Sequence, residues 1–350
     1  MKRYFILVCL AVQVTVAQRG IDWKRVVDLR EKQVRGTVLS TQDQEYLAKA
    51  LASLDSRQNS PMATRLALAG LTGDGTGEVF QAQPVRIGLD RAPVEILAAT
   101  ATDGRVIQGS YRRPPGKGPF PAVLMIHGGL DPQRPEKQAW FLTEGPVHTR
   151  LLAAGFIVAQ ATFRSYDRQN LLAPGPDLDV EALYVKLKSL PGVDPGSVVL
   201  FGGSGGGSLA LEIASRHRPA AVIAGEPATI LFAGMLKTGD YEPRLRMMGD
   251  PEAYYKEEQR QIMESKLRRI QCPLLLLSGD IHPLKVMNHE ILLPAAIEAG
   301  VMVEWRWYKG EGHGFYFGSA TPVETVVKVL QDVTAFLGKA LPVSARSISQ

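Results

Sequence analysis

Short hydrophobic runs alternate with longer segments of helical spacing along most of the chain after residue 90. The runs are rich in Val, Ile, Leu and Ala and have the length of strands, whereas most of the later intervals repeat their apolar positions with a helical period. The predicted strands are 94–98, 106–111, 122–127, 156–161, 198–202, 221–224, 274–278 and 301–308. The predicted helices are 147–154, 179–190, 204–217, 287–299 and 323–337. This pattern predicts an α/β fold with a mostly parallel central sheet, helices on both faces and antiparallel strands at the front edge.

The chain opens with the pattern of a secretory signal peptide. Lys2 and Arg3 precede an apolar run, and the small residues Thr15 and Ala17 occupy the minus-three and minus-one positions of a cleavage site. A membrane anchor is the alternative, but the run is shorter than the roughly 20 apolar residues that a span needs. We therefore expect residues 1–17 to be removed on export to the periplasm or the extracellular space, and no membrane span to remain.

Three further segments are expected after the signal peptide. Residues 18–80 have helical spacing followed by a linker at 71–78, so they predict a helical N-terminal extension. Residues 81–340 form the main α/β domain, and residues 341–350 form a C-terminal tail. Within the main domain, an amphipathic stretch between Pro227 and Ile270 is either a cap over the site or additional helical cover of the sheet.

Composition is that of an ordinary soluble globular protein, with 45% hydrophobic and 21% charged residues. The 40 Lys and Arg residues exceed the 35 Asp and Glu residues only slightly, which gives no argument for a nucleic-acid partner. Cys9 lies inside the expected signal peptide and Cys272 lies in an apolar run. We therefore expect no intrachain disulfide and a buried Cys272.

A cluster of glycines surrounds Ser204 in the stretch FGGSGGGSLA at 201–210. Glycine at this density destabilises strands and helices, so it requires a reason. The segment from Gly202 to Gly206 fits G-x-S-x-G between a strand and a helix, where a sharp turn strains the serine and the residues two positions away must lack side chains. A phosphate-binding loop does not fit, because no Lys-Ser or Lys-Thr pair follows the glycines. The pattern predicts Ser204 as a nucleophile, against the alternative of a glycine-rich turn without chemistry.

The other groups needed for acyl transfer also follow predicted strands. Two backbone N–H donors stabilise the oxyanion, one after the nucleophile and one in the loop after an earlier strand, so Gly205 and Gly129 are the candidates. His127 precedes the serine, whereas the base follows it in this architecture, so we expect a structural role for His127. His313 lies in the late loop YKGEGHGFYFG with a glycine on each side, and it is the candidate base.

Residues from about 93 to 340 resemble an α/β-hydrolase, and within that superfamily the prolyl oligopeptidase and dienelactone hydrolase branch. The matching stretches are DGRVIQGSYRRP, FPAVLMIHGG, LLAAGFIVAQATFR, LPGVDPGSVVLFGGSGGG and AIEAGVMVEWRWYKGEGHGF. The resemblance implies acyl transfer through a serine ester, with Ser204 as nucleophile and His313 as base. It implies no metal and no organic cofactor, and a small-molecule ester or a short peptide as substrate.

The position of the catalytic acid departs from this branch. Its members typically place an Asp three residues after the glycine that ends the next-to-last strand, but that position after Gly279 is His282. Asp280 is the nearest substitute, although it could merely cap the following turn, and Glu226 after the preceding strand is a second candidate. Because the acid orients the histidine, we expect its displacement to slow the reaction without abolishing it.

The sequence also predicts the class of substrate. Full-size prolyl oligopeptidases carry a propeller that filters peptides by size, and the segment before the main domain is too short to build one. We therefore expect an exported serine hydrolase, either a carboxylesterase or a short-peptide hydrolase. The alternative is a non-catalytic binding protein on the same scaffold, and His282 at the acid position is its main support.

Overall fold

The computed structural model describes residues 37–54, 93–240, 251–279, 287–317 and 321–341, together with the single positions Arg25, Leu29, Lys32, Met247 and Leu284. The expected signal peptide, the linker at 71–78, Asp280 and His282 lie outside the described residues.

The described residues form a central sheet of eight strands in the order β1-β2-β4-β3-β5-β6-β7-β8. The strands are β1 (Glu95–Thr100), β2 (Val106–Arg112), β3 (Phe120–Ile126), β4 (Ile157–Ala161), β5 (Val193–Gly203), β6 (Ala221–Gly225), β7 (Leu274–Gly279) and β8 (Val303–Tyr308). β2 pairs antiparallel with both β1 and β4, and the other neighbouring pairs are parallel. All the predicted strands are confirmed, including the antiparallel pair at one edge.

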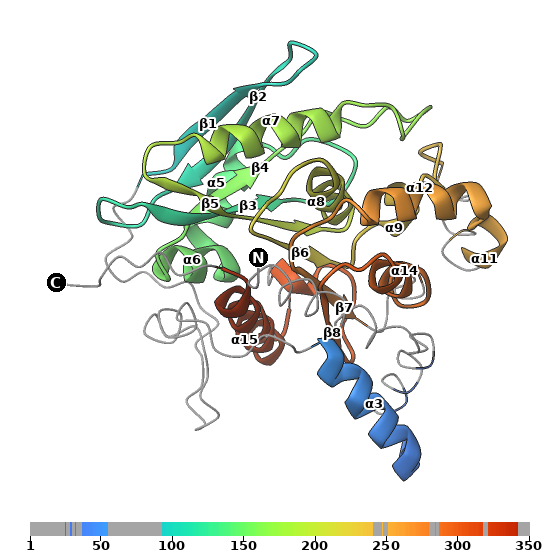
Figure 1. Cartoon of the computed structure of the whole chain (residues 1–350). Coiled ribbons are helices and arrows are strands. Elements are labelled where there is room, and N and C mark those ends of the chain that lie inside the picture. Colours follow the sequence, from blue (N-terminus) through green and yellow to red (C-terminus); the bar gives the residue numbers. More distant parts are fainter. Residues whose placement is uncertain are drawn as a thin grey trace, which may run out of the picture.

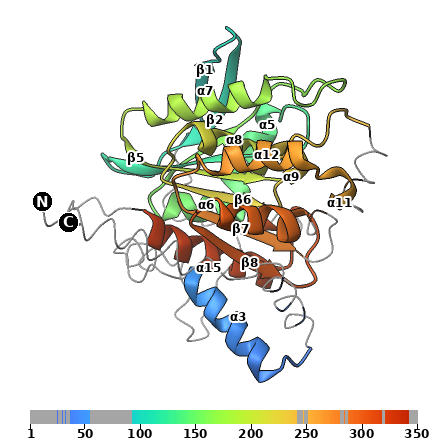
Figure 2. The ribbon, with the colours of Figure 1, turned by 45° about the vertical axis from the view of Figure 1, so that its right-hand side comes forward.

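Helices cover both faces of the sheet (Figures 1 and 2). They are α3 (Thr41–Leu54), α5 (Pro135–Glu144), α6 (Pro146–Ala153), α7 (Pro176–Lys188), α8 (Gly205–Arg216), α9 (Thr229–Phe232), α11 (Pro251–Tyr254), α12 (Glu257–Leu267), α14 (Leu293–Glu298) and α15 (Val323–Ala340), with a π-helix, η1 (Met287–Leu292), and a 3-10 turn, η2 (Phe315–Phe317). The predicted helices are confirmed, although the segment 287–299 starts as the π-helix. The sequence did not predict α5, because only Phe141 and Leu142 supply its buried apolar side chains.

Alternating residues of the strands build two separate cores. In β3, Leu124 and Ile126 pack with residues of α7, α8, α12 and α14, whereas Val123 and Met125 pack with residues of α6 and α15. This double burial explains the uninterrupted apolar runs of the parallel strands. It also gives the sheet two distinct sides, which we call the α7/α8 face and the α6/α15 face.

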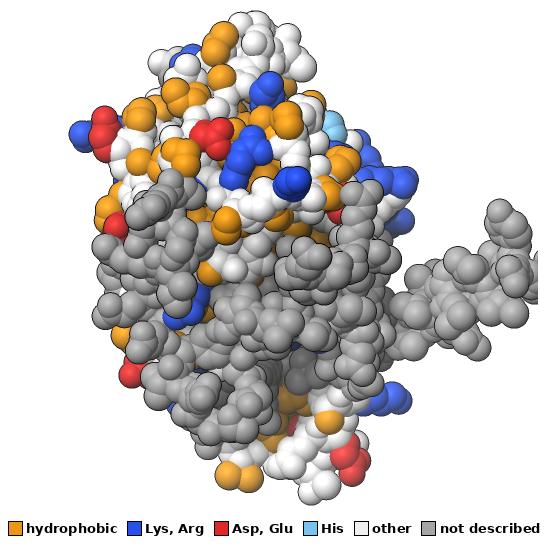
Figure 3. Space-filling model, turned by 90° about the vertical axis from the view of Figure 1, so that its left-hand side faces the viewer, with side chains coloured by type: hydrophobic (Ala, Val, Ile, Leu, Met, Phe, Trp, Pro, Cys, Tyr) orange, Lys and Arg blue, Asp and Glu red, His pale blue; other side chains and the backbone are white. Residues whose placement is uncertain are grey.

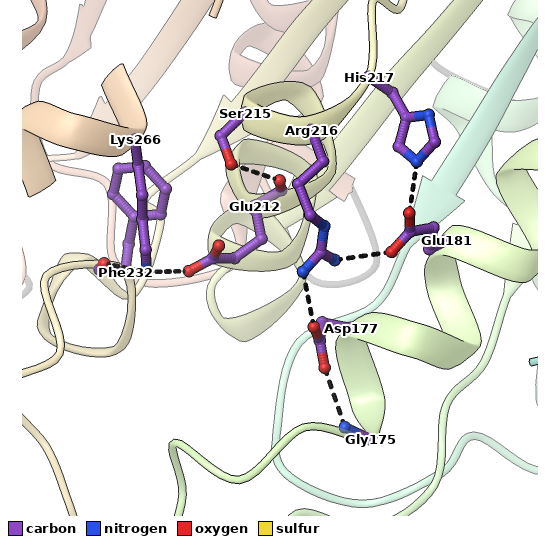
Figure 4. Close-up of polar contacts among 9 residues, drawn as sticks. All are labelled: Gly175, Asp177, Glu181, Glu212, Ser215, Arg216, His217, Phe232 and Lys266. Atoms are coloured by element: carbon purple, nitrogen blue, oxygen red, sulfur yellow. Dashed lines mark hydrogen bonds and ion pairs between the residues drawn. The ribbon is translucent and has the colours of Figure 1, made fainter. Parts of the chain in front are cut away.

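The described part of the stretch between β6 and β7 is cover on the α7/α8 face. In α12, Met263 and Leu267 are fully buried in the core of that face. Figure 4 shows Lys266 of α12 paired with Glu212 of α8, while Arg216 of α8 pairs with Asp177 and Glu181 of α7. These ion pairs join α7, α8 and α12 at the outer surface of the face.

The outer surface mixes apolar and charged side chains. Exposed hydrophobic residues include Ile96 and Val106 on the β1–β2 hairpin and Val185 on α7, and the upper part of Figure 3 shows orange side chains scattered among blue ones. Cys272 is free and buried, as predicted. Within the described residues, no helix has the length and apolar character needed to cross a membrane.

Candidate active site

Ser204 lies in a strained turn at the carboxyl end of β5. Its backbone has φ 55° and ψ −121°, a region that side-chain-bearing residues rarely adopt. The turn is held from both sides, because the Ser204 N–H donates to Gly225 O at 2.9 Å and the Ala228 N–H donates to Ser204 O at 2.9 Å. α8 starts at the next residue, so the serine has the strand-to-helix position of a nucleophile elbow.

The glycines two positions from Ser204 are required by close backbone approach. A Cβ at Gly202 would collide with the carbonyl of Gly206, and a Cβ at Gly206 would collide with the carbonyls of Ile126 and His127. The turn therefore brings β3, β5 and α8 closer together than side chains would allow. This finding gives the steric reason for the glycine cluster around the serine.

His313 is hydrogen-bonded to Glu226. The Nδ1 of His313 lies 2.8 Å from Glu226 Oε2, and the carboxylate side chain is 1% exposed. The Gly279 N–H donates to the other oxygen, Oε1, at 3.2 Å. Because a carboxylate only accepts hydrogen bonds, Nδ1 carries the proton and Nε2 is the basic nitrogen. The histidine thus has the tautomer that a general base for a serine requires.

Glu226 sits in a turn comparable to that of Ser204. It follows β6, the neighbour of β5, and has φ 40°. Its N–H donates to Leu277 O of β7 at 2.8 Å, so the backbone is fixed to the next strand. Among the described residues with side chains, Ser204 and Glu226 are the two that have positive φ. Strained backbone occurs at the carboxyl ends of two adjacent strands, which makes this end of the sheet the candidate site.

Tyr316 packs the histidine loop against the sheet. A Cβ at Gly225 would lie 2.5 Å from Cγ of the Tyr316 ring, and a Cβ at Gly203 would collide with the same ring. The His313 ring meets Tyr316 edge-on at a centroid distance of 6.3 Å. Burial, together with the charge of Glu226, holds the pKa of Tyr316 well above its ordinary value, so the phenol stays neutral. The ring therefore positions the base beside the strand that carries the serine.

The two predicted oxyanion donors lie side by side. A Cβ at Gly205 would lie 2.8 Å from Gly129 O and 3.7 Å from Gly129 N. Gly205 is the first residue of α8, and Gly129 has φ +88° in the loop after β3. A Cβ at Gly128 would lie 2.9 Å from Ser204 Cβ, so the β3 loop passes directly over the nucleophile. The structure thus brings together the loop and helix start that an oxyanion hole needs.

His127 has the structural environment predicted for it. Its Nδ1 contacts Gly128 O at 2.8 Å, and its ring stacks on Phe163 at 4.3 Å. Burial lowers the pKa of His127, and the Lys137 ammonium lowers it further. A neutral ring bonded to its own loop supports the backbone of the oxyanion glycines.

The structure brings together five predicted residues at the carboxyl ends of the strands: Ser204, His313, Glu226, Gly129 and Gly205. Asp280, the first candidate for the acid, lies outside the described residues, whereas the second candidate, Glu226, contacts the histidine directly. Sequence reasoning did not find Tyr316. The available signal was the pair Gly203 and Gly225, because a glycine at the end of each adjacent strand leaves room for a ring.

Part of the chain is similar to a known family of proteins. Residues 178–343 match a family of proteins described as "Prolyl oligopeptidase family". The matched segment covers slightly less than half of the chain. The serine, the glutamate and the histidine all fall inside the matched segment. No curated protein matches the chain.

Solved structures share the fold. A puromycin hydrolase is 23% identical with a TM-score of 0.56, covering 71% of this chain and 39% of its own. Esterase Est22 is 19% identical with a TM-score of 0.54, covering 78% of this chain and 86% of its own. Pyrococcus horikoshii acylaminoacyl peptidase is 13% identical with a TM-score of 0.55, covering 74% of this chain and 43% of its own. The chain thus spans about two fifths of the puromycin hydrolase and of the acylaminoacyl peptidase and most of the esterase, and all three have the α/β-hydrolase fold.

Proposed function

We propose that this protein is an exported serine hydrolase that cleaves small esters or short peptides with Ser204 as nucleophile, His313 as base and Glu226 as acid. The observation that supports this most directly is the 2.8 Å contact between His313 Nδ1 and the buried Glu226 carboxylate. A buried carboxylate on a histidine fixes the ring and stabilises its charged form during proton transfer. Glu226 takes the role of acid in this proposal, in place of Asp280.

The reaction proceeds in two acyl-transfer steps. His313 Nε2 takes the proton of Ser204 Oγ as the oxygen attacks the carbonyl carbon, and the N–H groups of Gly205 and Gly129 stabilise the negative oxygen. The imidazolium then gives its proton to the leaving group, which departs and leaves an acyl ester on Ser204. Water, deprotonated by the same histidine, attacks this ester, and the imidazolium returns the proton to Ser204 Oγ as the carboxylic acid product leaves. Glu226 stabilises the imidazolium in both steps and is not itself protonated.

Both ester and peptide substrates fit this mechanism. The structural neighbours include a puromycin hydrolase and an esterase, and the chain covers most of the esterase's length. These similarities support a small substrate of either class. The choice between them is made by a screen of esters and short peptides on the purified protein.

The test of an activated serine is labelling by a fluorophosphonate probe, which reacts with serines made nucleophilic by a base. We expect wild-type protein to be labelled, Ser204→Ala to be unlabelled and Ser215→Ala, a serine further along α8, to be labelled like wild type. A folded wild-type protein that fails to react would contradict the proposal and favour a non-catalytic binding protein on this scaffold.

Export is tested separately from activity. The N-terminal pattern of Lys2, Arg3 and Ala17 supports cleavage after Ala17. We expect the mass of protein recovered outside the cytoplasm to correspond to a chain starting at Gln18. Recovery of the uncleaved chain from the cytoplasm would contradict export and would leave the proposed chemistry untouched.

A further inference from the structure

A cavity of about 420 Å³ adjoins the proposed nucleophile. Its lining includes Gly128 of the β3 loop, Phe141 of α5, His148 of α6 and Phe317 of η2. The direct link to the site is Gly128, because a Cβ there would lie 3.6 Å from Ser204 Oγ. The cavity is therefore close enough to receive part of a substrate bound at the serine.

One wall of the cavity comes from the loop that carries the histidine. Phe317 follows His313 in the same loop, and it packs with Tyr316 in the core of the α6/α15 face. Phe317 also packs against Phe141 and His148 across the cavity. In acyl transfer the imidazolium protonates the leaving atom, so the leaving group must lie on the histidine side of the serine.

The lining carries a net positive charge. Arg134 and Lys137 both line the cavity, and within the described residues neither forms an ion pair. Asp131, the acidic residue of the lining, is already paired with Arg168 at 2.6 Å. Lys137 contributes to lowering the pKa of His127, another lining residue, so its charge acts on the cavity. The first turn of α5 adds the positive end of a helix dipole at the same place, and the exposed Glu136 of that turn offsets part of this charge.

The inner part of the cavity combines aromatic walls with hydrogen-bonding groups. Phe141 and Phe317 supply the apolar wall, while His148 Nε2 contacts Gln160 Oε1 at 2.9 Å. Two buried polar atoms of the lining, Gln133 Oε1 and His148 Nδ1, have no hydrogen-bond partner in the described structure. Buried polar atoms without partners are rare in native proteins. Both atoms are hydrogen-bond acceptors, because the His148 Nε2–H donates to Gln160, so their partners in a ligand would be donors and not its carboxylate.

We propose that this cavity selects substrates whose leaving group carries a carboxylate, which Arg134 and Lys137 bind. The inference rests on the proposed function and specifies its substrate. Two kinds of molecule share this chemistry: an ester of a hydroxy acid and a short peptide with a free C-terminal carboxylate. Exposed cations act mainly through long-range attraction, so they favour an anion without requiring one geometry.

The ester arm of the test compares 4-acetoxybenzoate with 4-acetoxybenzamide, which have the same acyl group and differ in the charge of the leaving group. The measured quantity is the ratio of their kcat/KM values in wild type, in Arg134→Gln/Lys137→Gln and in Lys117→Gln. Lys117 is an exposed lysine before β3, at the opposite end of the strand from the cavity. We expect the ratio to fall about tenfold or more in the double variant and to be unchanged in Lys117→Gln, with a smaller effect at high salt.

The peptide arm compares acetyl-Phe-Ala with acetyl-Phe-Ala-amide in the same variants, with release of Ala or Ala-amide as the readout. A fall of the ratio in either arm supports the inference and identifies the source of the carboxylate. An unchanged ratio in both arms, with the neutral substrates still cleaved in a Ser204-dependent way, overturns it while the proposed function stands. If no substrate is cleaved by wild type, the proposed function fails and the inference fails with it.

A third pair tests the side of the serine. The compounds 4-nitrophenyl hemisuccinate and 4-nitrophenyl butyrate place the charge on the acyl group instead. We expect the double variant to leave their ratio within about twofold of wild type. A tenfold fall for this pair alone would mean that the cavity receives the acyl group, and it would overturn the leaving-group assignment.

Discussion

Glu226 accepts a hydrogen bond from His313, which lies 87 residues further along the chain, at 2.8 Å. The carboxylate comes from the end of β6, next to the strand that ends at Ser204. Serine and acid therefore project from adjacent strand ends, and the base is brought to them by the loop after β8. This arrangement gives His313 a carboxylate partner although position 282 is not an acid.

We predict that Glu226→Gln lowers kcat/KM by about 10² to 10⁴, because the amide still fits but does not stabilise the imidazolium. Asp280→Asn is the matched comparison, and we expect its kcat/KM to stay within about tenfold of wild type. The measurement is hydrolysis of an activated ester, with circular dichroism as the control for folding. The reverse order of the two effects would assign the acid to Asp280.

Packing of the Tyr316 ring against Gly225 predicts that a side chain at position 225 destabilises the fold. Gly225→Ala should lower the free energy of unfolding by about 1–3 kcal/mol, since the added methyl would lie 2.5 Å from the ring. In Gly312→Ala the methyl has no atom within 4 Å, so we expect a change within about 0.5 kcal/mol, or slight stabilisation. Urea unfolding measures both variants. Combining Gly225→Ala with Tyr316→Leu should destabilise by less than the sum of the single changes, and strict additivity would argue against the contact.

Burial of the His148 imidazole predicts that the protein is less stable in mild acid. Burial lowers its pKa to about 4 from an unfolded value near 6.5, so between these values the unfolded chain binds the proton more readily than the folded one. The free energy of unfolding therefore falls by about 3 kcal/mol as the pH decreases from about 6.5 to 4. Urea unfolding at pH 7 and pH 4.5 measures it. The drop should be smaller in His148→Gln, and an equal drop in both proteins would exclude His148 as its source.

The two acidic partners of Arg164 are expected to contribute unequally to the free energy of unfolding. The fully buried Asp179 accepts from the Arg164 backbone N–H at 2.7 Å and from the guanidinium at 2.6 and 3.0 Å. We expect Asp179→Ala to destabilise by about 3–5 kcal/mol, because it leaves a cation without its buried partner. Asp103, also paired with Arg164, has a side chain that is 37% exposed, and Asp103→Ala should cost at most about 1 kcal/mol. Thermal or urea unfolding of both variants compares them, and equal losses would contradict the assignment.

The sequence predicted the sheet well because parallel strands buried on two sides leave long apolar runs, as in Leu274–Gly279. It predicted Ser204 and His313 because a strained turn requires glycines at fixed positions and because chain order separates base from nucleophile. The acid was ambiguous, since a carboxylate after either of two neighbouring strands can reach one histidine. The contact of Glu226 with His313 appears only in three dimensions. Tyr316 and the charged lining of the cavity were not predicted, because their roles depend on contacts between loops far apart in the chain.

The three residues of the proposed triad are anchored by different means. Ser204 and Glu226 are fixed by backbone hydrogen bonds of the sheet itself. The described contacts of His313 instead include the Glu226 carboxylate and the Tyr316 ring, which is seated over Gly203 and Gly225. Loosening of the C-terminal segment would therefore separate the base first, while the serine kept its strained turn. A change confined to the loop of His313 is therefore expected to remove the proposed base and to leave the central sheet intact.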